Sequence, residues 1–191
     1  MYRTIYNHRI NEISSWILEN IIKSIRNGLK DEIWIDKSLF NWIFSFKNLS
    51  FEDFLANDDV MLGYHLMRWK KEAPEPLSTL CKMYIDRQLL KASNISFLNN
   101  IQKLELLAFT KKKCEESNFD SNLFCGIKEK KFHGFESNNS LKVWDGSYLI
   151  NLDKASALVK TLMRVEDSSL IIYPEEIQNE IKNKILILKN N

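Results

Sequence analysis

Residues 5–29, IYNHRINEISSWILENIIKSIRNGL, contain the pattern that decides the fold of the first half of the chain. Apolar side chains recur there at helical spacing, at Ile13, Trp16, Ile17, Ile21 and Ile25. Residues three and four apart lie on one face of an α-helix, so the stretch predicts one long amphipathic helix with a buried face. The helix is expected to stop near its glycine, because glycine suits the residue that follows a helix.

Further helices are expected after this one. The next covers residues 33–46, with Asp36 or Ser38 as its N-cap, and another begins after the cap residue Ser50. A helix over residues 77–91 would follow the Pro-rich turn at residues 74–76. One more helix is predicted over residues 101–114. The side chains expected to face inward from it are Leu104, Leu107 and Ala108.

The pattern changes after about residue 117. Residues 123–132 and 141–152 are strand-like, and Asp145-Gly146 between apolar pairs is typical of a hairpin turn. A helix over residues 155–163, a buried strand over residues 170–173 and a last helix beginning at Pro174 complete the prediction. The sequence therefore predicts an α+β fold with a mostly helical part, 1–117, and a smaller α+β part, 118–191.

Composition excludes several classes of protein. The chain has 191 residues, 45% of them hydrophobic, and a net charge of +2. That charge is too small to indicate nucleic-acid binding. No run of about 18 apolar residues predicts a membrane helix. The cysteines, Cys81, Cys114 and Cys125, fit neither a disulfide framework nor a zinc site, so we expect reduced thiols in a cytoplasmic protein.

The residues alone give no catalytic centre. The three histidines, His8, His65 and His133, are widely spaced, and no His-Asp dipeptide occurs. Asp58-Asp59 is a carboxylate pair, but neighbouring helical residues do not face one ligand, and an N-cap explains the pair better. No Gly-rich phosphate loop is present. We therefore predict no catalytic residue, metal ligand or cofactor in this chain.

Two clusters have the chemistry to bind an anion. The first is YRTIYNHR at residues 2–9, which includes Arg3, Tyr6, Asn7, His8 and Arg9. Its rings can stack on a base and its guanidinium groups can pair with phosphates; a partly exposed helix start is the alternative. The second is Arg87 with Lys91, four residues apart on the predicted helix; a solvated face or a salt bridge is the alternative.

Taken together, these segments resemble a known family. MYRTIYNHR (residues 1–9), FLANDD (54–59) and YIDRQLLK (84–91) are similar, in order and spacing, to the part of HD-domain phosphohydrolases that follows their catalytic core. The C-terminal region adds a similar succession of strands, a helix with Ser156 and Pro174-Glu175-Glu176. The resemblance covers nearly the whole chain.

The resemblance implies roles for the matched residues. Members of this family hydrolyse phosphate esters, notably deoxynucleoside triphosphates, with a divalent metal held by His and Asp ligands upstream of the matched segments. No matching ligand positions exist here. Tyr6, Asn7 and Arg3 would then contact the substrate, and the residues expected to bind a regulatory nucleotide are His8, Arg9, Arg87 and Lys91.

Two functional hypotheses follow. In the first, the chain is the C-terminal part of an HD-type phosphohydrolase acting on nucleotides, inactive alone, with the divalent metal in a missing HD half. It would contribute a pocket wall and subunit contacts, and its partners would be a nucleotide and either further copies of itself or a separate HD-containing segment. In the second, the chain is a non-catalytic nucleotide-binding or oligomerisation module. Neither hypothesis involves a membrane or a nucleic acid.

Overall fold

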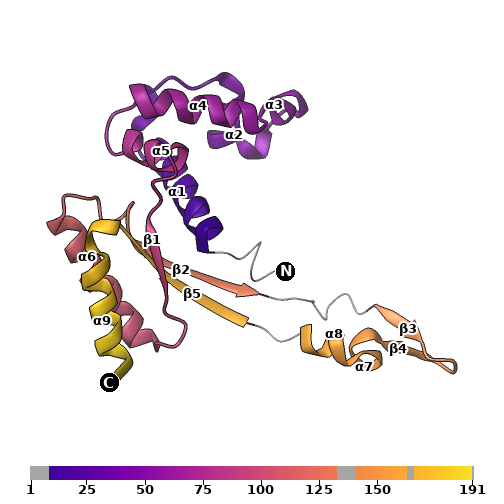
Figure 1. Ribbon diagram of the computed structural model, residues 1–191. Helices are drawn as coiled ribbons and strands as arrows, with labels where there is room; N and C mark the ends of the chain where they lie inside the picture. The colour runs from indigo at the N-terminus through magenta and orange to yellow at the C-terminus, as the bar shows by residue number, and fades with distance from the viewer. Residues whose placement is uncertain (1–8, 133–140, 163–165, 191) are drawn as a thin grey trace.

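The structure of the protein is a computed structural model that describes residues 9–132, 141–162 and 166–190. The chain has the predicted α+β fold. Figure 1 shows a group of helices, α1 to α5, on one side of a three-stranded sheet, with α6 and α9 beside the sheet. A small hairpin with two short helices extends away at the far end of strands β2 and β5.

Helix α1 (Arg9–Arg26) confirms the predicted amphipathic helix, and residues 5–8 lie outside the described part of the chain. Ile17, Ile21 and Ile25 are completely buried. Gly28 follows the helix with φ 141°, a conformation that side chains with a Cβ rarely adopt, and a short 3₁₀ helix, η2 (Leu29–Asp31), continues the chain. The Arg26 guanidinium donates two hydrogen bonds, of 3.0 and 2.8 Å, to the carbonyl oxygen of Ile43 and so fixes α1 to α2.

The next helices begin at caps that the sequence predicts. Asp36, Ser50 and Asp58 each accept a hydrogen bond from a backbone N–H in the first turn. The Asp58-Asp59 pair is thus a helix start, as expected. The elements of this region are α2 (Lys37–Phe44), η3 (Phe46–Asn48), α3 (Phe51–Ala56) and α4 (Asp59–Glu72).

The helix predicted over residues 77–91 is shorter than expected. Helix α5 (Leu77–Ile85) ends before Arg87, whose φ of 55° is left-handed, and Lys91 begins strand β1 (Lys91–Asn94). Arg87 and Lys91 therefore do not share a helix face, and that prediction is wrong. Pairing of β1 with a distant strand overrides the local helical pattern.

The sheet contains β1, β2 (Gly126–Phe132) and β5 (Glu166–Tyr173), all antiparallel, in the order β1-β5-β2. The strands predicted over residues 123–132 and 170–173 are confirmed as β2 and β5. Lys91 and Gly126 pair with the last residues of β5, Tyr173 and Ile172 respectively. Because β5 lies in the centre, its apolar end is the core of the sheet, with Ile171 and Ile172 completely buried.

Helices α6 (Asn100–Glu116) and α9 (Gln178–Asn190) lie side by side against the sheet, as Figure 1 shows. A capping box of Asn99 and Gln102 begins α6, and the 3₁₀ helix η5 (Glu175–Ile177) leads into α9. The inward face predicted for α6 is wrong, because Leu104 and Ala108 are exposed and Leu107 is only half-buried. The buried residues of α6 are Leu106, Thr110 and Cys114.

The predicted hairpin is confirmed in β3 (Lys142–Trp144) and β4 (Leu149–Asn151). Its turn has Gly146 at φ 107°, and the N–H of Asp145 donates to the carbonyl oxygen of Tyr148. Instead of the single helix predicted over residues 155–163, two short helices follow, α7 (Leu152–Ala155) and α8 (Ala157–Leu162). Extended backbone at Ser156 separates them.

The two predicted regions share one sheet, since β1 precedes residue 117 and β2 and β5 follow it. The boundary at residue 117 stays a prediction. None of the described helices combines the length and the apolar character that crossing a membrane requires.

Candidate functional site

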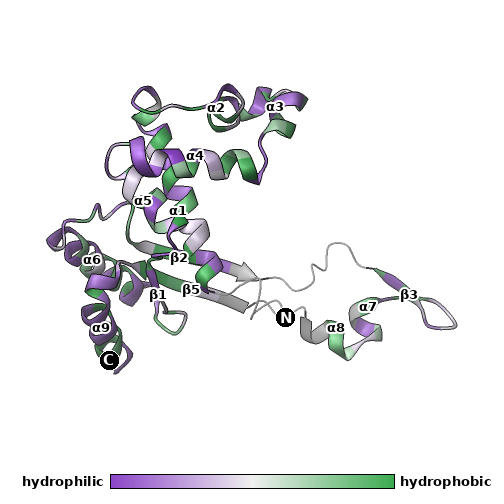
Figure 2. Cartoon of the chain, turned by 45° about the horizontal axis from the view of Figure 1, so that its top comes forward, coloured by the Kyte–Doolittle hydropathy of each residue, from purple (hydrophilic) through white to green (hydrophobic). Residues whose placement is uncertain are grey.

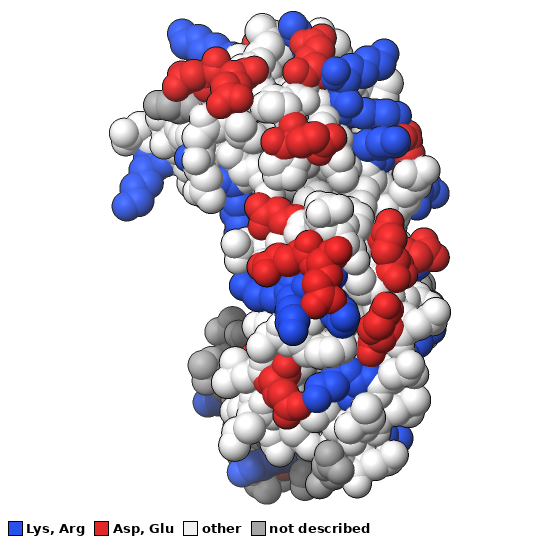
Figure 3. Space-filling view, turned by 90° about the vertical axis from the view of Figure 1, so that its left-hand side faces the viewer, with Lys and Arg blue, Asp and Glu red and all other residues white. Residues whose placement is uncertain are grey.

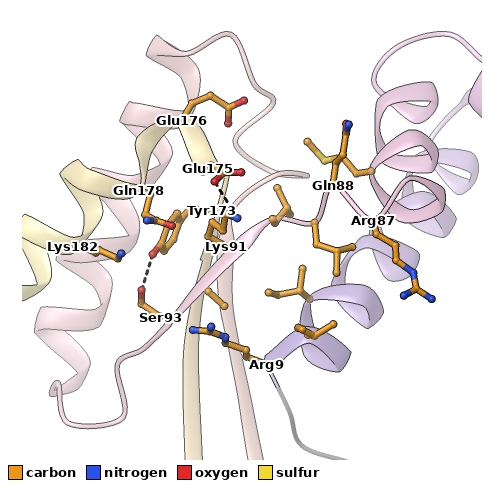
Figure 4. A pocket seen from close by; sticks show the side chains of 16 residues that line it. Arg9, Arg87, Gln88, Lys91, Ser93, Tyr173, Glu175, Glu176, Gln178 and Lys182 are labelled. Atoms are coloured by element: carbon orange, nitrogen blue, oxygen red, sulfur yellow. Dashed lines mark hydrogen bonds and ion pairs between the residues drawn. The ribbon is translucent and has the colours of Figure 1, made fainter.

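A cleft of about 850 Å³ lies where three parts of the chain meet: the start of α1, the connection from α5 into β1, and the passage from β5 through η5 into α9. Figure 4 shows the side chains that line it. Apolar side chains, among them Ile13, Met83 and Leu89, form part of the wall. The charged side chains of the lining are Arg9, Arg87, Lys91, Lys182, Glu175 and Glu176.

The cleft brings together three residues that the sequence assigned to nucleotide binding. Arg9 comes from the first turn of α1, Arg87 from the loop after α5, and Lys91 from the first position of β1. They meet through tertiary packing and not, as predicted for Arg87 and Lys91, through helical spacing. Figure 4 shows the Arg87 guanidinium directed away from Lys91, so these groups do not form one preformed anion clamp.

The remaining predicted residues fall before the first described residue. Arg3, Tyr6, Asn7 and His8 all lie outside the described ranges, so the structure does not test their roles. Arg9 begins α1 directly after them and lines the cleft.

Lys91 is held at the wall of the cleft by a carboxylate. Its Nζ lies 3.1 Å from Oε1 of Glu175, and both side chains are substantially exposed. Exposed pairs of this kind contribute between 0 and about 1 kcal/mol, so an anionic ligand could replace the carboxylate at little cost. The pair is therefore an exchangeable contact.

A second contact fixes the strands beneath the cleft. The hydroxyl groups of Ser93 and Tyr173 share a hydrogen bond of 2.6 Å, which joins β1 to the last residue of β5 (Figure 4). Tyr173 is almost completely buried, so its ring forms a rigid part of the wall. The contact helps to fix the strand that carries Lys91, whose side chain reaches Glu175 of η5.

Tyr173, Ser93 and Lys182 were not identified from the sequence. Lys182 reaches the cleft from α9, about 90 residues after Lys91, and only the packing of α9 beside the sheet places it there. No local pattern signals such a position. The sequence does show a predicted strand that ends in an aromatic residue and is followed by Pro174 and two glutamates. That pattern does not by itself indicate a cleft.

The charges in the cleft favour a ligand with several negative charges. Four basic side chains line it against two acidic ones. Figure 3, in contrast, shows acidic and basic side chains interspersed over one face of the molecule, without an extended region of one sign. That face has none of the continuous positive charge that nucleic-acid binding requires.

The described residues contain no group of three or more His, Cys, Asp or Glu side chains arranged to hold a metal ion. His65 is buried among the aromatic rings of Trp34 and Trp69, remote in the chain from any cleft residue. The guanidinium and ammonium groups that line the cleft can recognise an anion.

No family model matches the chain, and no curated protein matches it in sequence. In three dimensions the chain is similar to a phosphohydrolase from Bacteroides thetaiotaomicron whose crystal structure is known, with a TM-score of 0.68 and 17% identical residues. The similarity covers 92% of this chain and 47% of that chain, so this chain spans about half the length of that phosphohydrolase. At this identity the likeness concerns the fold alone: this chain folds like about half of that phosphohydrolase.

Proposed function

We propose that the chain acts as the C-terminal part of an HD-type phosphohydrolase and binds a nucleotide through its cleft. The observation that carries the proposal is the meeting of Arg9, Arg87 and Lys91, from three separate segments, at one cleft of a phosphohydrolase-like fold. In this proposal the divalent metal belongs to a separate HD-containing segment. Tyr6, Asn7 and Arg3 would contact the substrate beside that metal, and His8 would join Arg9 in binding the nucleotide.

The cleft suits a nucleotide in size and chemistry. Its volume of about 850 Å³ falls in the range of roughly 300–1,000 Å³ that is usual for small-molecule sites. Guanidinium groups bind phosphate oxygens through two parallel hydrogen bonds, and Lys91 and Lys182 add point charges. The apolar side chains of Ile13 and Leu89 offer contacts to a sugar or base. Arg87 is exposed, so its side chain can rotate toward the ligand without rearranging the core.

Calorimetric titration of the full chain with deoxynucleoside triphosphates tests the proposal. We expect saturable binding, and we expect Arg9→Ala and Lys91→Ala each to weaken it about tenfold, because a hydrogen bond to a charged group contributes roughly 1.5–3 kcal/mol. Lys82→Ala is the matched control, since Lys82 is an exposed cation of α5 outside the cleft. An uncharged nucleoside should bind far more weakly. Absence of binding at millimolar triphosphate would refute the proposal.

The catalytic part of the proposal has its own test. The chain alone, supplied with Mn²⁺ or Mg²⁺, should release no triphosphate or phosphate from deoxynucleotides, because its metal ligands are assigned to another segment. Metal-dependent release that persists after repurification would contradict this assignment. Binding without turnover is the combined result that we expect.

A role in self-association is the second candidate, and the helices α2 to α4 favour it. Large apolar side chains there are more than half exposed, and hydrophobic stretches of α3 and α4 are visible in Figure 2. They include Phe46, Phe51, Phe54, Leu55 and Val60. Exposed apolar groups gathered on neighbouring helices are typical of protein interfaces. Light scattering should detect a dimer that Phe51→Lys with Phe54→Lys converts to a monomer; a wild-type monomer at high concentration would count against this role.

A further inference from the structure

The hairpin β3–β4 and the helices α7 and α8 form an arm, residues 141–162, whose elements pack on one another. Figure 1 shows the arm beyond the far ends of β2 and β5. Of the arm side chains that the structure describes, none is buried. A two-stranded hairpin is only marginally stable in water unless another surface covers it. The arm therefore needs a docking surface to be stable.

One face of the hairpin is apolar and exposed. Trp144 and Leu149 are directly opposite each other in the pairing of β3 with β4, and they are 62% and 60% exposed. Lys142 lies on the same face as Trp144, because alternate residues of a strand share a face. Val143, on the opposite face, is less exposed. The outward face of the arm thus combines two large apolar side chains with a cation.

A second exposed apolar surface lies on α3 and α4. Its side chains recur three or four residues apart along each helix, so each group occupies one helix face. All of them are more than half exposed, whereas an amphipathic helix normally turns such a face toward a core or a partner. We call this set the α3–α4 surface: Phe51, Phe54 and Leu55 of α3 with Val60, Tyr64 and Met67 of α4.

The charges beside the two surfaces are opposite in sign. Glu52 and Asp59 are exposed in the first turns of α3 and α4, and within the described part of the chain neither has a cationic partner. Lys142 and Lys154 of the arm are also exposed, and among the described residues neither has a carboxylate partner. The arm and the α3–α4 surface are therefore complementary in charge as well as apolar.

We propose that the arm of one copy of this chain docks on the α3–α4 surface of a second copy. The proposal rests on the second candidate function, self-association, and is independent of nucleotide binding. It names both sides of the contact. Within one chain the arm and the helices α3 and α4 lie apart (Figure 1), so the two surfaces meet between copies.

A symmetric contact of two α3–α4 surfaces is the alternative, and charge disfavours it. A two-fold contact brings the same surface of both copies together, so Glu52 and Asp59 would face the same carboxylates of the second copy. Like charges across an interface are repulsive. The arm instead brings Lys142 and Lys154 to these carboxylates.

The arm also has enough apolar area for a specific contact. Trp144 and Tyr148 are each 62% exposed and together would bury on the order of 250 Å² on docking. Leu141, Leu149 and Leu158 are at least as exposed as a fraction of their surface, or nearly so, and add to this area. The sum approaches the roughly 800 Å² per partner that is usual for stable interfaces.

The first experiment measures the mass of the full chain by light scattering, for single variants and for mixtures. Trp144→Glu with Leu149→Glu disables the arm, and Phe51→Lys with Phe54→Lys disables the α3–α4 surface. We expect each double variant alone to be monomeric. An equal mixture of the two should form dimers, because one intact arm can still dock on one intact surface. A symmetric contact of α3–α4 surfaces would give no dimer in the mixture.

Charge reversal is the second experiment. Lys142→Glu with Lys154→Glu should weaken self-association roughly tenfold, as expected for the loss of two exposed ion pairs. Glu52→Lys with Asp59→Lys should weaken it by a similar factor. The chain with all four changes should recover most of the lost affinity, because the pairs are restored with their signs exchanged. Sedimentation over a concentration series measures the dissociation constants.

A matched control and the contrary outcomes complete the test. Lys82→Glu with Lys112→Glu reverses two exposed lysines outside both surfaces and should leave self-association unchanged. Urea unfolding checks that each variant is folded, and the charge reversals decide the matter if an apolar variant is not. A wild type that stays monomeric at high concentration would overturn both this proposal and self-association. A wild-type dimer without recovery in the mixture or in the fourfold variant would overturn the arm contact alone.

Discussion

The imidazole of His65 joins α4 to the start of α2: its Nε2 accepts a 3.0 Å hydrogen bond from the backbone N–H of Asp36. Its Nδ1 lies 2.8 Å from the carbonyl oxygen of Met61 and acts as a donor there. The ring is completely buried and stacks on Trp34. One buried side chain thus accepts a hydrogen bond from the N–H of the α2 cap residue and also packs α4 against the start of α2.

Replacement of His65 by leucine should therefore destabilise the protein. The change puts an apolar side chain of similar size in place of the imidazole and leaves the Asp36 N–H without its acceptor, at a cost of about 1–3 kcal/mol. Urea unfolding followed by circular dichroism measures the loss. Val60→Ala, an exposed substitution on the same helix, should change stability by less than about 0.5 kcal/mol. Equal midpoints for His65→Leu and the wild type would contradict this prediction.

The Asp36 cap should make stability depend on acid pH. Hydrogen bonds from the Ser38 hydroxyl, at 2.6 Å, and from the Ser38 N–H, at 2.8 Å, lower the pKa of Asp36 from its ordinary value of 3.8. The carboxylate therefore stabilises the fold fully above about pH 4. This contribution is lost as the pH falls through the lowered pKa of the folded state.

Two substitutions separate the charge of Asp36 from its role as a cap. Asp36→Asn keeps an acceptor without an ionisable group, so it should match the wild type at neutral pH but lose less stability between pH 4 and 2. Asp36→Ala should lose about 1 kcal/mol at neutral pH, as is usual for removal of an N-cap. Urea midpoints across this pH series are the measurement, and identical acid profiles for the wild type and Asp36→Asn would exclude the Asp36 contribution.

Gly126 is expected to tolerate no side chain. A Cβ at this position would lie 2.3 Å from one carbon of the Trp16 ring and 2.7 Å from another. The ring is fixed by a hydrogen bond from Trp16 Nε1 to the carbonyl oxygen of Leu123, so it cannot move away freely. Gly126→Ala should therefore cost roughly 1–3 kcal/mol through overpacking.

Gly63 provides a matched control of opposite sign. It lies inside α4, and a Cβ there would meet nothing within 4 Å. Gly63→Ala should stabilise the protein by up to about 1 kcal/mol, because alanine favours helices. Thermal unfolding of both variants is the test. The clash is confirmed if adding Trp16→Leu to Gly126→Ala restores part of the lost stability, and it is contradicted if both glycine variants behave alike.

Glu175 should compete with an anionic ligand for Lys91. Glu175→Gln removes the carboxylate 3.1 Å from Lys91 Nζ and makes the cleft more positive. If the proposed function is correct, this variant should bind a deoxynucleoside triphosphate roughly threefold more tightly, in keeping with the small energy of an exposed pair. Glu180→Gln, on α9 outside the cleft, should leave affinity unchanged. Weaker binding by Glu175→Gln would contradict the prediction that Glu175 competes with the ligand for Lys91.

Local chemistry made most of the secondary structure predictable. Ser50 and Asp58 were identified as caps, and Asp36 was one of two candidates with Ser38, because capping depends on residues two or three positions away. The Asp145-Gly146 turn was identified for the same reason. The apolar stripe of α1 was predicted correctly because it repeats, from Ile13 to Ile25, over more than three helical turns.

The wrong predictions concern residues whose conformation or burial depends on contacts with segments distant in the sequence. Residues 86–91 continue the helical pattern of α5, but pairing of Lys91 with Tyr173, about 80 residues later, makes them a loop and a strand. The buried face of α6 depends on where α9 and the sheet lie, and its own apolar residues do not reveal it. In the cleft, Arg9, Arg87 and Lys91 were identified as anion-binding candidates from residue chemistry, and the family resemblance added the expected nucleotide role. Lys182 and Tyr173 depend on packing alone.

The strand order β1-β5-β2 has a consequence for how the protein is made. Among the described strands, β1 and β2 do not pair with each other, and each pairs with β5, which begins at Glu166. On the ribosome, both earlier strands must therefore remain without a sheet partner until β5 has emerged, while α1 to α5 are already free to pack. The cleft residue Lys91 acquires its neighbour Tyr173 only at that stage, so the wall of the cleft forms after β5 has emerged.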